Sequence, residues 1–287
     1  MKISIITVCK NAQASIEKAI TSVITQTYKD IEYIIIDGDS QDGTKSVVAK
    51  YSAFISKFVS EPDRSLWSAM NKGIRLATGE FIYFLNSDDY LIDKNVVKDV
   101  VNFIVQHSSC DFVYGDIEIR FNTGHANIQK SPAPEKILET MITGCTIPHS
   151  GSFIRSKLFS KLGGYNENYK IGSDYEWVTR LMQDESLNKG YYPRTIASFY
   201  GSGLSSNFRQ NLTEMFEIQN QVILYQDKDW LVKRIEKLQN EYIDTYEELQ
   251  TLREVVEARQ TVITAMIIRE LRRFKRGWVR WKRLIGL

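Results

Sequence analysis

An apolar run from Phe81 to Leu85 stops at a polar turn that contains two adjacent carboxylates, Asp88 and Asp89. An unbroken apolar run of this length is typical of a strand buried on both faces, as in a parallel α/β sheet. In open α/β sheets, ligands bind in the crevice beyond the carboxyl ends of the strands. The chain is therefore expected to fold around a buried strand that delivers two acidic side chains to a ligand crevice.

The two carboxylates of this turn repel each other, and each raises the pKa of the other unless a cation lies nearby. Mg²⁺ or Mn²⁺ is the expected cation, because it prefers oxygen ligands and is commonly held by one or two carboxylates together with substrate phosphates. The alternative is a polar loop in which one Asp caps a helix that begins near Asp93. Taken alone, the acidic pair favours this alternative.

The first half of the chain alternates between strand-like and helix-like segments. The predicted strands are 3–9, 32–37, 54–59 and 81–85, and the predicted helices are 45–51, 65–77 and one that carries Ile16, Ile20, Val23 and Ile24 on one face. Short alternating units of this kind predict a parallel sheet with right-handed crossovers.

Asp37 ends the second predicted strand, so it is expected at the same crevice as Asp88. A carboxylate in this position can accept hydrogen bonds from a ribose hydroxyl or from a base N–H. The alternative is a local turn role, because Asp before Gly38 is also favoured for bonding the nearby backbone.

Charge is unevenly distributed along the 287 residues, which are 43% hydrophobic and 25% charged, as in ordinary soluble globular proteins. Residues 266–287 carry eight basic side chains and one acidic side chain, a net charge of +7, whereas the rest of the chain has 29 basic and 34 acidic side chains, a net charge of −5. Two regions with different roles are therefore expected. The three cysteines and three histidines are scattered, which argues against a zinc site and favours reduced thiols in a cytosolic compartment.

From about Asn207 the sequence becomes helical and charged. Apolar residues recur in steps of four and three, interrupted by Thr245 and Arg259, and this seam consists of Leu231, Ile235, Leu238, Tyr242, Leu249, Leu252, Val256, Ile263 and Met266. The heptad pattern predicts a long helix over about 229–266 that either associates with another copy of the chain or folds back on the first domain.

The last segment, 266–287, is predicted as a basic amphipathic helix with Trp278 and Trp281 on its apolar face. Such a helix is typical of one that lies in a membrane interface. A nucleic-acid-binding tail is the alternative, but nothing in the first half of the chain indicates a nucleic-acid module. No apolar run is long enough to cross a membrane, and no signal peptide is visible at the start.

Several motifs in order resemble the family 2 glycosyltransferases of the GT-A fold. The resemblance covers roughly residues 2–205 and rests on the segments 5–11, 36–44, 69–73, 77–80, 85–89, 149–153, 163–165 and 172–177. It implies an α/β fold with a GT-A-type nucleotide-binding sheet and flanking helices, followed by the long helical extension. The expected domains are 1–206 for catalysis, 207–265 for the coiled-coil-like segment and 266–287 for the amphipathic helix.

The resemblance also implies roles for individual residues. A nucleotide-diphosphate sugar is expected to bind near Thr7, Val8, Asp37, Asp39, Arg64 and Asp88, with Asp37 at the base, Asp88 near the ribose and Asp89, with Asp88, at the metal. Asp174 falls on the second position of the family's Glu-Asp motif and is the expected general base, while Ser173 replaces the Glu. Lys10 occupies a position often filled by Tyr, and His149 and Trp177 are the acceptor-side candidates.

The implied activity is the metal-dependent, inverting transfer of a single sugar, with a UDP-sugar favoured as donor. A cytoplasmic location, peripheral on the inner face of the membrane, is expected and would bring the enzyme to a lipid-linked or cell-envelope polysaccharide acceptor. Because the chain lacks the Gln-X-X-Arg-Trp motif of processive members, one transfer per encounter is expected. The alternatives are a nucleotidyltransferase, which would usually carry a Gly-rich phosphate loop after the first strand, and a degenerate transferase that acts as a coiled-coil scaffold.

Overall fold

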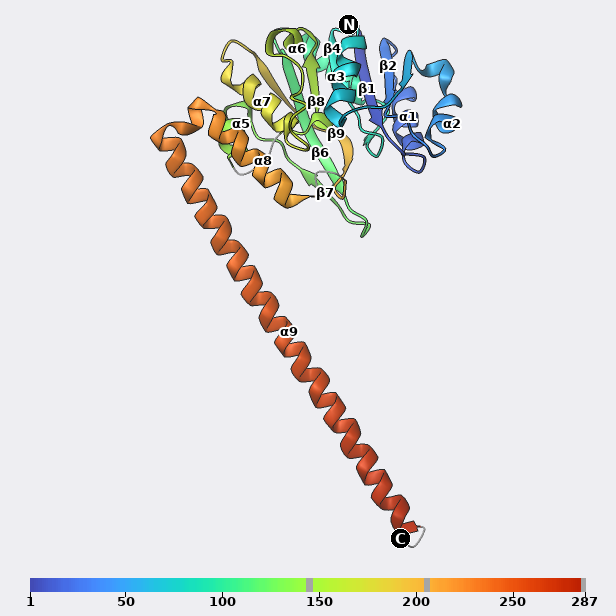
Figure 1. Ribbon diagram of the computed structural model, residues 1–287, viewed down its shortest axis with the longest axis vertical. Coiled ribbons are helices and arrows are strands. Elements are labelled where there is room, and N and C mark those ends of the chain that lie inside the picture. Colours follow the sequence, from blue (N-terminus) through green and yellow to red (C-terminus); the bar gives the residue numbers. More distant parts are fainter. Residues whose placement is uncertain (143–146, 204–206, 285–287) are drawn as a thin grey trace. The chain divides into compact units, whose positions relative to one another are not determined.

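The computed structural model describes residues 1–142, 147–203 and 207–284, and within the last range it leaves out some side chains, including all of those after Arg272. The chain divides into two compact units, Met1–Trp230 and Leu231–Leu287. The first unit is an α/β domain and the second is a single helix (Figure 1). The expected fold class is confirmed: a curved mixed sheet with flanking helices is followed by a long C-terminal helix.

The elements follow one another along the chain with these bounds: β1 Ile3–Cys9, α1 Ile16–Ile24, β2 Ile31–Asp37, α2 Thr44–Ala49, η1 Ser52–Phe54, β3 Lys57–Ser60, α3 Leu66–Leu76, β4 Phe81–Phe84, β5 Tyr90–Leu91, α4 Val96–Gln106, β6 Phe112–Arg120, β7 Ala126–Gln129, η2 Pro134–Lys136, α5 Ile137–Met141, η3 His149–Gly151, β8 Ser152–Arg155, α6 Lys157–Leu162, α7 Ser173–Gln183, β9 Lys189–Tyr200, α8 Phe208–Gln221, η5 Ile223–Gln226 and α9 Lys228–Leu284. The expected strand at 54–59 is partly wrong, because residues 52–54 form a 3₁₀ turn and the strand begins only at Lys57.

Helix α3 shows how local sequence sets the end of an element. Ser65 is its N-cap, and its hydroxyl accepts a hydrogen bond from the Ser68 N–H at 3.1 Å. The Ser68 hydroxyl accepts one from the Ser65 N–H in return, also at 3.1 Å, which completes a capping box. The helix therefore begins where the sequence predicts.

The sheet has the strand order β3-β2-β1-β4-β8-β6-β9-β5, with β7 paired to β6. The four strands from β3 to β4 are parallel to one another, as predicted. β8 is antiparallel to both β4 and β6, and β9 is parallel to β6. The carboxyl ends of β1, β2, β4, β6 and β9 therefore lie at one edge of the sheet, together with the amino end of β8.

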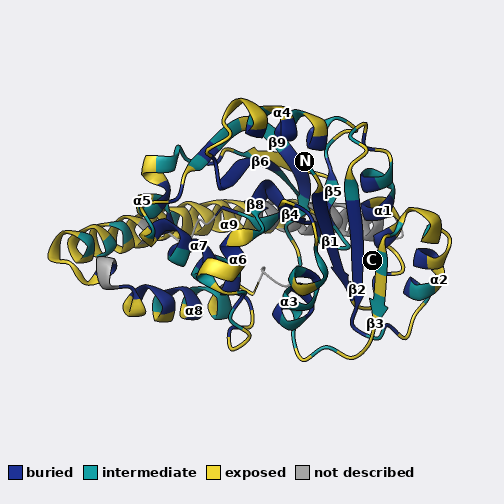
Figure 2. Ribbon diagram, turned by 90° about the horizontal axis from the view of Figure 1, so that it is seen from above, coloured by how far each residue is buried: buried dark blue, intermediate teal, exposed yellow. Residues whose placement is uncertain are grey.

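Helices cover both faces of the sheet, and the buried strands form the middle layer (Figure 2). One apolar core joins the sheet to α1, α2 and α4, and the other joins it to α3, α5, α6, α7 and α8. Alternate residues of a strand serve the two cores, since Ile5 lies in one and Ile6 in the other. Burial on both faces explains why these strands are continuously apolar in sequence.

Helix α8 belongs to the first compact unit, which continues to Trp230 and so extends beyond the expected boundary at residue 206. Met215 and Ile218 of α8 are 5% and 2% exposed and pack in the same core as Trp177. The catalytic unit consequently includes a helix that sequence reasoning placed in the extension.

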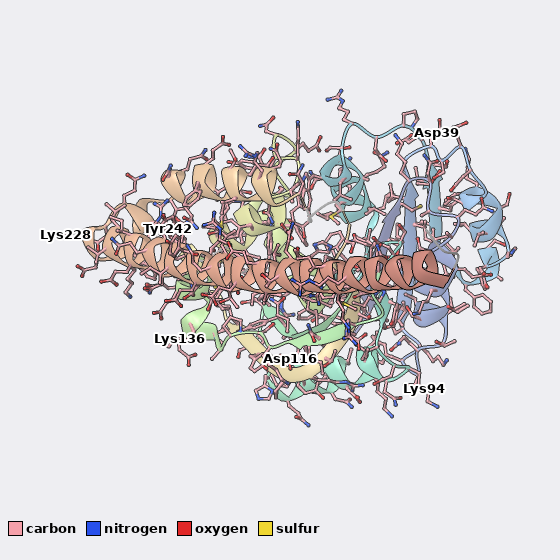
Figure 3. The ribbon with its side chains drawn as sticks, turned by 90° about the horizontal axis from the view of Figure 1, so that it is seen from below. Asp39, Lys94, Asp116, Lys136, Lys228 and Tyr242 are labelled. Carbon is pink, nitrogen blue, oxygen red and sulfur yellow. The ribbon has the colours of Figure 1, made fainter. Side chains whose placement is uncertain are left out.

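The second unit is the continuation of α9, which begins at Lys228 (Figure 3). Its described apolar side chains are open to solvent, among them Tyr242 at 72%, Leu249 at 61% and Leu252 at 63% exposed. Most side chains of the expected amphipathic segment, 266–287, lie outside the described residues. Of the described helices, none combines the length and apolar character needed to span a bilayer.

Candidate active site

Acidic and polar side chains gather at the sheet edge where the parallel strands end. Asp37 ends β2, Asp88 and Asp89 follow β4, and His149 lies immediately before β8. The reversed direction of β8 matters, because it brings the start of that strand next to the end of β4. The structure thus brings together side chains that are far apart in the sequence.

Asp89 is almost completely buried, with 1% of its surface exposed. Its Oδ1 accepts a hydrogen bond of 2.8 Å from the backbone N–H of Tyr200 at the end of β9. Its Oδ2 is buried and has no hydrogen-bond partner among the described residues. Burial, together with the nearby charge of Asp88, raises the pKa of the Asp89 carboxyl to about 7. An anionic Asp89 therefore needs a positive charge beside it to be stable.

The acidic pair fits a divalent cation that has its other ligands supplied by a substrate. No three His, Cys, Asp or Glu side chains in the described ranges lie close enough to hold a metal ion by themselves. Two carboxylates are, however, the usual protein contribution to an Mg²⁺ site that substrate phosphates complete. The buried, unpartnered Oδ2 of Asp89 is the observation that supports this use.

Arg120, at the end of β6, holds the acidic turn in place, and no motif in the sequence indicates this role. Its guanidinium donates to the backbone oxygen of Asp88 and, at 2.8 Å, to the backbone oxygen of Ser198. It also lies 4.7 Å from the centre of the Tyr90 ring. Its charge lowers the pKa of Asp89, but burial outweighs it. A lone Arg in a strand that sequence analysis did not predict could not have been identified in advance.

Asp174 lies in the first turn of α7 and is joined to His149. The Asp174 Oδ2 is 3.3 Å from His149 Nδ1, and its Oδ1 accepts a hydrogen bond of 2.8 Å from the Tyr175 N–H. The other ring nitrogen, His149 Nε2, is 3.0 Å from the Asn86 Nδ2. The expected base and one acceptor-side candidate therefore lie together, and they are linked to the turn that carries the acidic pair.

Glu214 of α8 holds the loop that precedes α7, and sequence reasoning missed it. Its carboxylate accepts hydrogen bonds from three successive N–H groups, those of Lys170 at 2.9 Å, Ile171 at 2.9 Å and Gly172 at 2.7 Å. These bonds outweigh the effect of burial and lower the pKa of Glu214. The carboxylate thus holds the loop two residues before Asp174. The contact joins residues more than 40 positions apart, so no local pattern could indicate it.

Asp37 is fully buried. Its carboxylate accepts hydrogen bonds from the Ser40 N–H at 3.0 Å, from the Ser60 hydroxyl at 2.6 Å and from the Ser40 hydroxyl. Although burial raises the pKa of Asp37, these bonds lower it below the ordinary value. The carboxylate organises the loop between β2 and α2, and its contact with a nucleotide base stays a prediction.

Other expected site residues do not present their side chains at this edge. Trp177 is 1% exposed and donates from Nε1 to the Gly163 oxygen at 2.9 Å, so it is part of the core and offers no free face to an acceptor sugar. Thr7 and Val8 are also buried, at 0% and 5% exposed. Val8 packs in one of the two apolar cores, and the Thr7 hydroxyl is hydrogen-bonded to the Tyr33 hydroxyl at 3.1 Å, so neither side chain is available to a ligand.

Two further expected residues lie in loops. Arg64 is exposed just before α3. Asp39, labelled in Figure 3, has a left-handed backbone with φ of 58°. Its Oδ1 pairs with the Lys45 ammonium at 3.0 Å. Their contact with a nucleotide sugar stays a prediction.

Comparison with known proteins identifies relatives in sequence and in structure. Residues 4–163 match the family Glycosyl transferase family 2. A PGL/p-HBAD biosynthesis glycosyltransferase from Mycobacterium bovis (strain BCG / Pasteur 1173P2) is 30% identical over 207 residues, which cover 71% of this chain and 78% of the relative. An uncharacterized glycosyltransferase from Rickettsia typhi is 31% identical over 197 residues, covering 64% of this chain and 60% of the relative.

Solved structures share the fold. Residues 1–349 of S. aureus TarS, crystallised with UDP-GlcNAc, align with a TM-score of 0.61 at 19% identity, covering 81% of this chain and 69% of that one. A longer TarS chain aligns with a TM-score of 0.62 at 22% identity, and 41% of its length is covered. A mannosyltransferase from Pyrobaculum calidifontis, in complex with GDP-Man and Mn²⁺, aligns with a TM-score of 0.61 at 15% identity, covering 82% of this chain and 69% of that one.

Proposed function

This chain belongs to glycosyl transferase family 2 and is a glycosyltransferase. We propose that it transfers one sugar from a UDP-sugar to a hydroxyl of a lipid-linked or polysaccharide acceptor, and that the transfer inverts the configuration of the anomeric carbon. The observation that carries the proposal is the position of Asp174 at the same sheet edge as Asp88 and the buried Asp89, linked to their turn through His149 and Asn86. A nucleotidyltransferase is no longer an alternative, given the family.

The leaving-group side of the reaction is assigned to Asp88 and Asp89. Bound there, Mg²⁺ or Mn²⁺ would stabilise the negative charge that builds on the departing diphosphate. The buried Oδ2 of Asp89 is the atom we expect to contact the cation, because nothing else in the described chain satisfies it. The complex of a structural neighbour with GDP-Man and Mn²⁺ supports this assignment.

The acceptor side is assigned to Asp174. As the acceptor oxygen attacks the anomeric carbon, its proton passes to the Asp174 carboxylate, and the bond from that carbon to the diphosphate oxygen breaks with its electrons leaving on the diphosphate. A single displacement of this kind inverts the anomeric centre. A positioned base of this type typically contributes about 10²–10⁴-fold to the rate.

The donor nucleotide is assigned to the loops after β1 and β2. The two loops are joined, since the Gly38 N–H donates to the Cys9 oxygen at 2.8 Å and the Asn11 N–H donates to the Ser40 hydroxyl at 2.7 Å. We assign the nucleotide base to the region of Asp37 and Asp39. The backbone after Val8 and the side chain of Arg64 are expected to line the same region. The UDP-GlcNAc complex of a neighbour supports a uridine nucleotide.

Calorimetric titration of the full chain with UDP, GDP, dTDP and CDP, each with and without Mn²⁺, tests the donor site. We expect selective binding of UDP that requires Mn²⁺. Asp89→Ala should remove the effect of Mn²⁺, whereas the exposed control Glu185→Ala should bind as the parent does. Unchanged Mn²⁺ dependence in Asp89→Ala would exclude Asp89 from the metal site.

We propose two roles for the extension: pairing with a second copy of the chain and attachment to the inner face of a membrane. The seam of α9 over 229–266 would pair with a second copy, because Leu249 and Leu252 are solvent-exposed at heptad positions of this chain. Leu249→Lys with Leu252→Lys should give a monomer in sedimentation equilibrium, while Glu247→Lys, on the opposite face, should not. A parent that is itself monomeric would refute the pairing.

Membrane binding is proposed for 266–287, which carries a net charge of +7. Each basic residue near an anionic surface contributes ~1 kcal/mol. Replacing Arg272, Arg273, Lys275 and Arg276 with Gln should release the full chain from phosphatidylserine vesicles. Continued co-sedimentation of this variant would refute the anchor.

A further inference from the structure

Three side chains connect the acidic turn to helix α7. Asn86 follows β4, His149 begins η3, and Asp174 lies in the first turn of α7. The Asn86 Nδ2 is 3.0 Å from His149 Nε2, and His149 Nδ1 is 3.3 Å from the Asp174 Oδ2. The side chains of His149 and Asp174 are 10% and 20% exposed. The imidazole therefore fills the space between its partners and leaves part of the carboxylate accessible.

The partners determine where the hydrogen of the imidazole lies. An ionised carboxylate only accepts hydrogen bonds, so His149 Nδ1 must carry the hydrogen that faces Asp174. The amide nitrogen of Asn86 donates, so His149 Nε2 accepts. A neutral ring with its hydrogen on Nδ1 satisfies both contacts. Because the Asn86 amide does not titrate, a proton received by Asp174 cannot continue along this path, and the ring cannot act as a proton relay.

We propose that His149 is a positioning residue that holds the base Asp174 and sets its separation from the acidic turn. The Asp174 Oδ1 is fixed by the Tyr175 N–H and Oδ2 by His149. Each oxygen retains a lone pair for the proton of an acceptor hydroxyl. Through Asn86, the same ring is joined to the turn that carries Asp88 and Asp89. The inference rests on the proposed role of Asp174.

Two variants of His149 separate this role from simple space filling. His149→Asn keeps an amide nitrogen at the place of Nδ1 and can still donate to Asp174, whereas His149→Gln reaches the place of Nε2 and can keep only the contact with Asn86. The assay that distinguishes them is Mn²⁺-dependent hydrolysis of UDP-GlcNAc by the full chain. For the Gln variant we expect a kcat ~10- to 100-fold lower than that of the parent. The reason is that displacing a catalytic group by about 1 Å can lower a rate by ~100-fold.

The same assay should show the Asn variant much closer to the parent. KM for UDP-GlcNAc should stay unchanged in both variants, since neither alters the donor loops, and their thermal midpoints should fall by similar small amounts, because each variant loses one hydrogen bond of the ring. His107→Gln, at an exposed position, is the matched control and should have parental kcat. Parental kcat in His149→Gln, or equal losses in the Asn and Gln variants, would overturn the proposal.

A second measurement is independent of activity. The chain has only three histidines, so nitrogen-15 spectra of histidine-labelled protein can distinguish the tautomers of each ring. We expect His149 to carry its hydrogen on Nδ1, and Asp174→Ala to change the Nδ1 signal of that ring alone. Hydrogen on Nε2 in the parent would overturn the inference. Failure of the parent to bind or hydrolyse any sugar nucleotide would instead refute the proposed function, and the tautomer would still decide whether His149 holds Asp174.

Discussion

Replacing Asp89 with Asn should stabilise the metal-free protein at pH 8 while it removes metal-dependent donor binding. The carboxyl of Asp89 is 1% exposed and its pKa is raised to about 7, chiefly by burial and also by Asp88. In the unfolded chain the same group has a pKa near 3.8. At pH 8 the native state must therefore hold a charge that the interior disfavours. At 1.36 kcal/mol for each pKa unit, the difference between the two pKa values lowers the free energy of unfolding by ~4 kcal/mol.

The sign follows from proton binding. Between pH 3.8 and pH 7 the native carboxyl binds a proton that the unfolded one has lost, so stability falls as the pH rises through this window. The neutral amide of Asn avoids this loss and can still accept from the Tyr200 N–H, but its buried NH₂ group lacks an acceptor, which costs about 1–3 kcal/mol. A net gain of ~2 kcal/mol at pH 8 is expected, and it should vanish near pH 5.

Thermal unfolding in EDTA at pH 8 and pH 5 measures this difference. For a domain of this size, ~2 kcal/mol corresponds to about 4–8 °C in the midpoint at pH 8. Asp37→Asn is the matched control with the opposite sign, because the buried carboxylate of Asp37 accepts bonds from Ser40 and Ser60 and its pKa is lowered. That variant should lose stability at pH 8.

Mn²⁺ with UDP should then raise the midpoint of the parent and leave that of Asp89→Asn unchanged. An Asn variant that is no more stable than the parent at pH 8, or a difference that does not depend on pH, would refute the reasoning that Asp89 carries an uncompensated buried charge. The main structural support for a cation at the acidic pair would then be lost.

Changes at three further residues test two other parts of the site, Asp174 and Glu214, and one buried carboxylate at the amino end of β2, Glu32. Asp174→Asn should keep Mn²⁺-dependent UDP binding in calorimetry and lower kcat by about 10²–10⁴-fold; near-parental turnover would assign the base to another residue. Glu214→Ala removes the acceptor of three backbone N–H groups and should lower both kcat and the thermal midpoint. Glu214→Gln keeps an acceptor oxygen and should have a smaller effect on both. Equal effects of the two variants would contradict the role of the Glu214 carboxylate in holding the loop. The Glu32 carboxylate is buried, but hydrogen bonds from Ser4, Thr78 and Lys57 outweigh burial and lower its pKa to about 2, so stability should fall by up to ~3 kcal/mol between pH 5 and pH 2. Acid unfolding of Glu32→Gln should lack this component, and an unchanged slope would contradict the assignment.

Local elements were predictable because their determinants are local. The strand at 3–9 and the strand at 81–85 have continuous apolar sequences, and the structure confirms β1 at Ile3–Cys9 and β4 at Phe81–Phe84. The third strand was predicted too early, since Phe54 is 61% exposed and belongs to a 3₁₀ turn. Apolar character alone does not distinguish an exposed aromatic in a turn from a residue of a neighbouring strand.

The site was predictable only in part. The acidic residues at strand ends were visible, because a parallel sheet places those ends at one edge. Trp177 was expected as an acceptor-side candidate, but its helix turns that face into the core, where it packs 4.9 Å from the Phe159 ring. Arg120 and Glu214 were missed because their partners lie in other elements, far along the chain.

The sequence by itself determined strands β1, β2 and β4, the family and the identity of the acidic residues, since these depend on periodicity and on short motifs. Only the tertiary structure decided which of those groups are buried, and which are paired. Asp37 and Asp89 both follow buried strands, yet one carboxylate is fully bonded and the other has an unpartnered oxygen. Solvent exposure and hydrogen-bond partners are set by elements that pack from elsewhere in the chain, and this is why His149, before an antiparallel strand, comes to lie between Asn86 and Asp174.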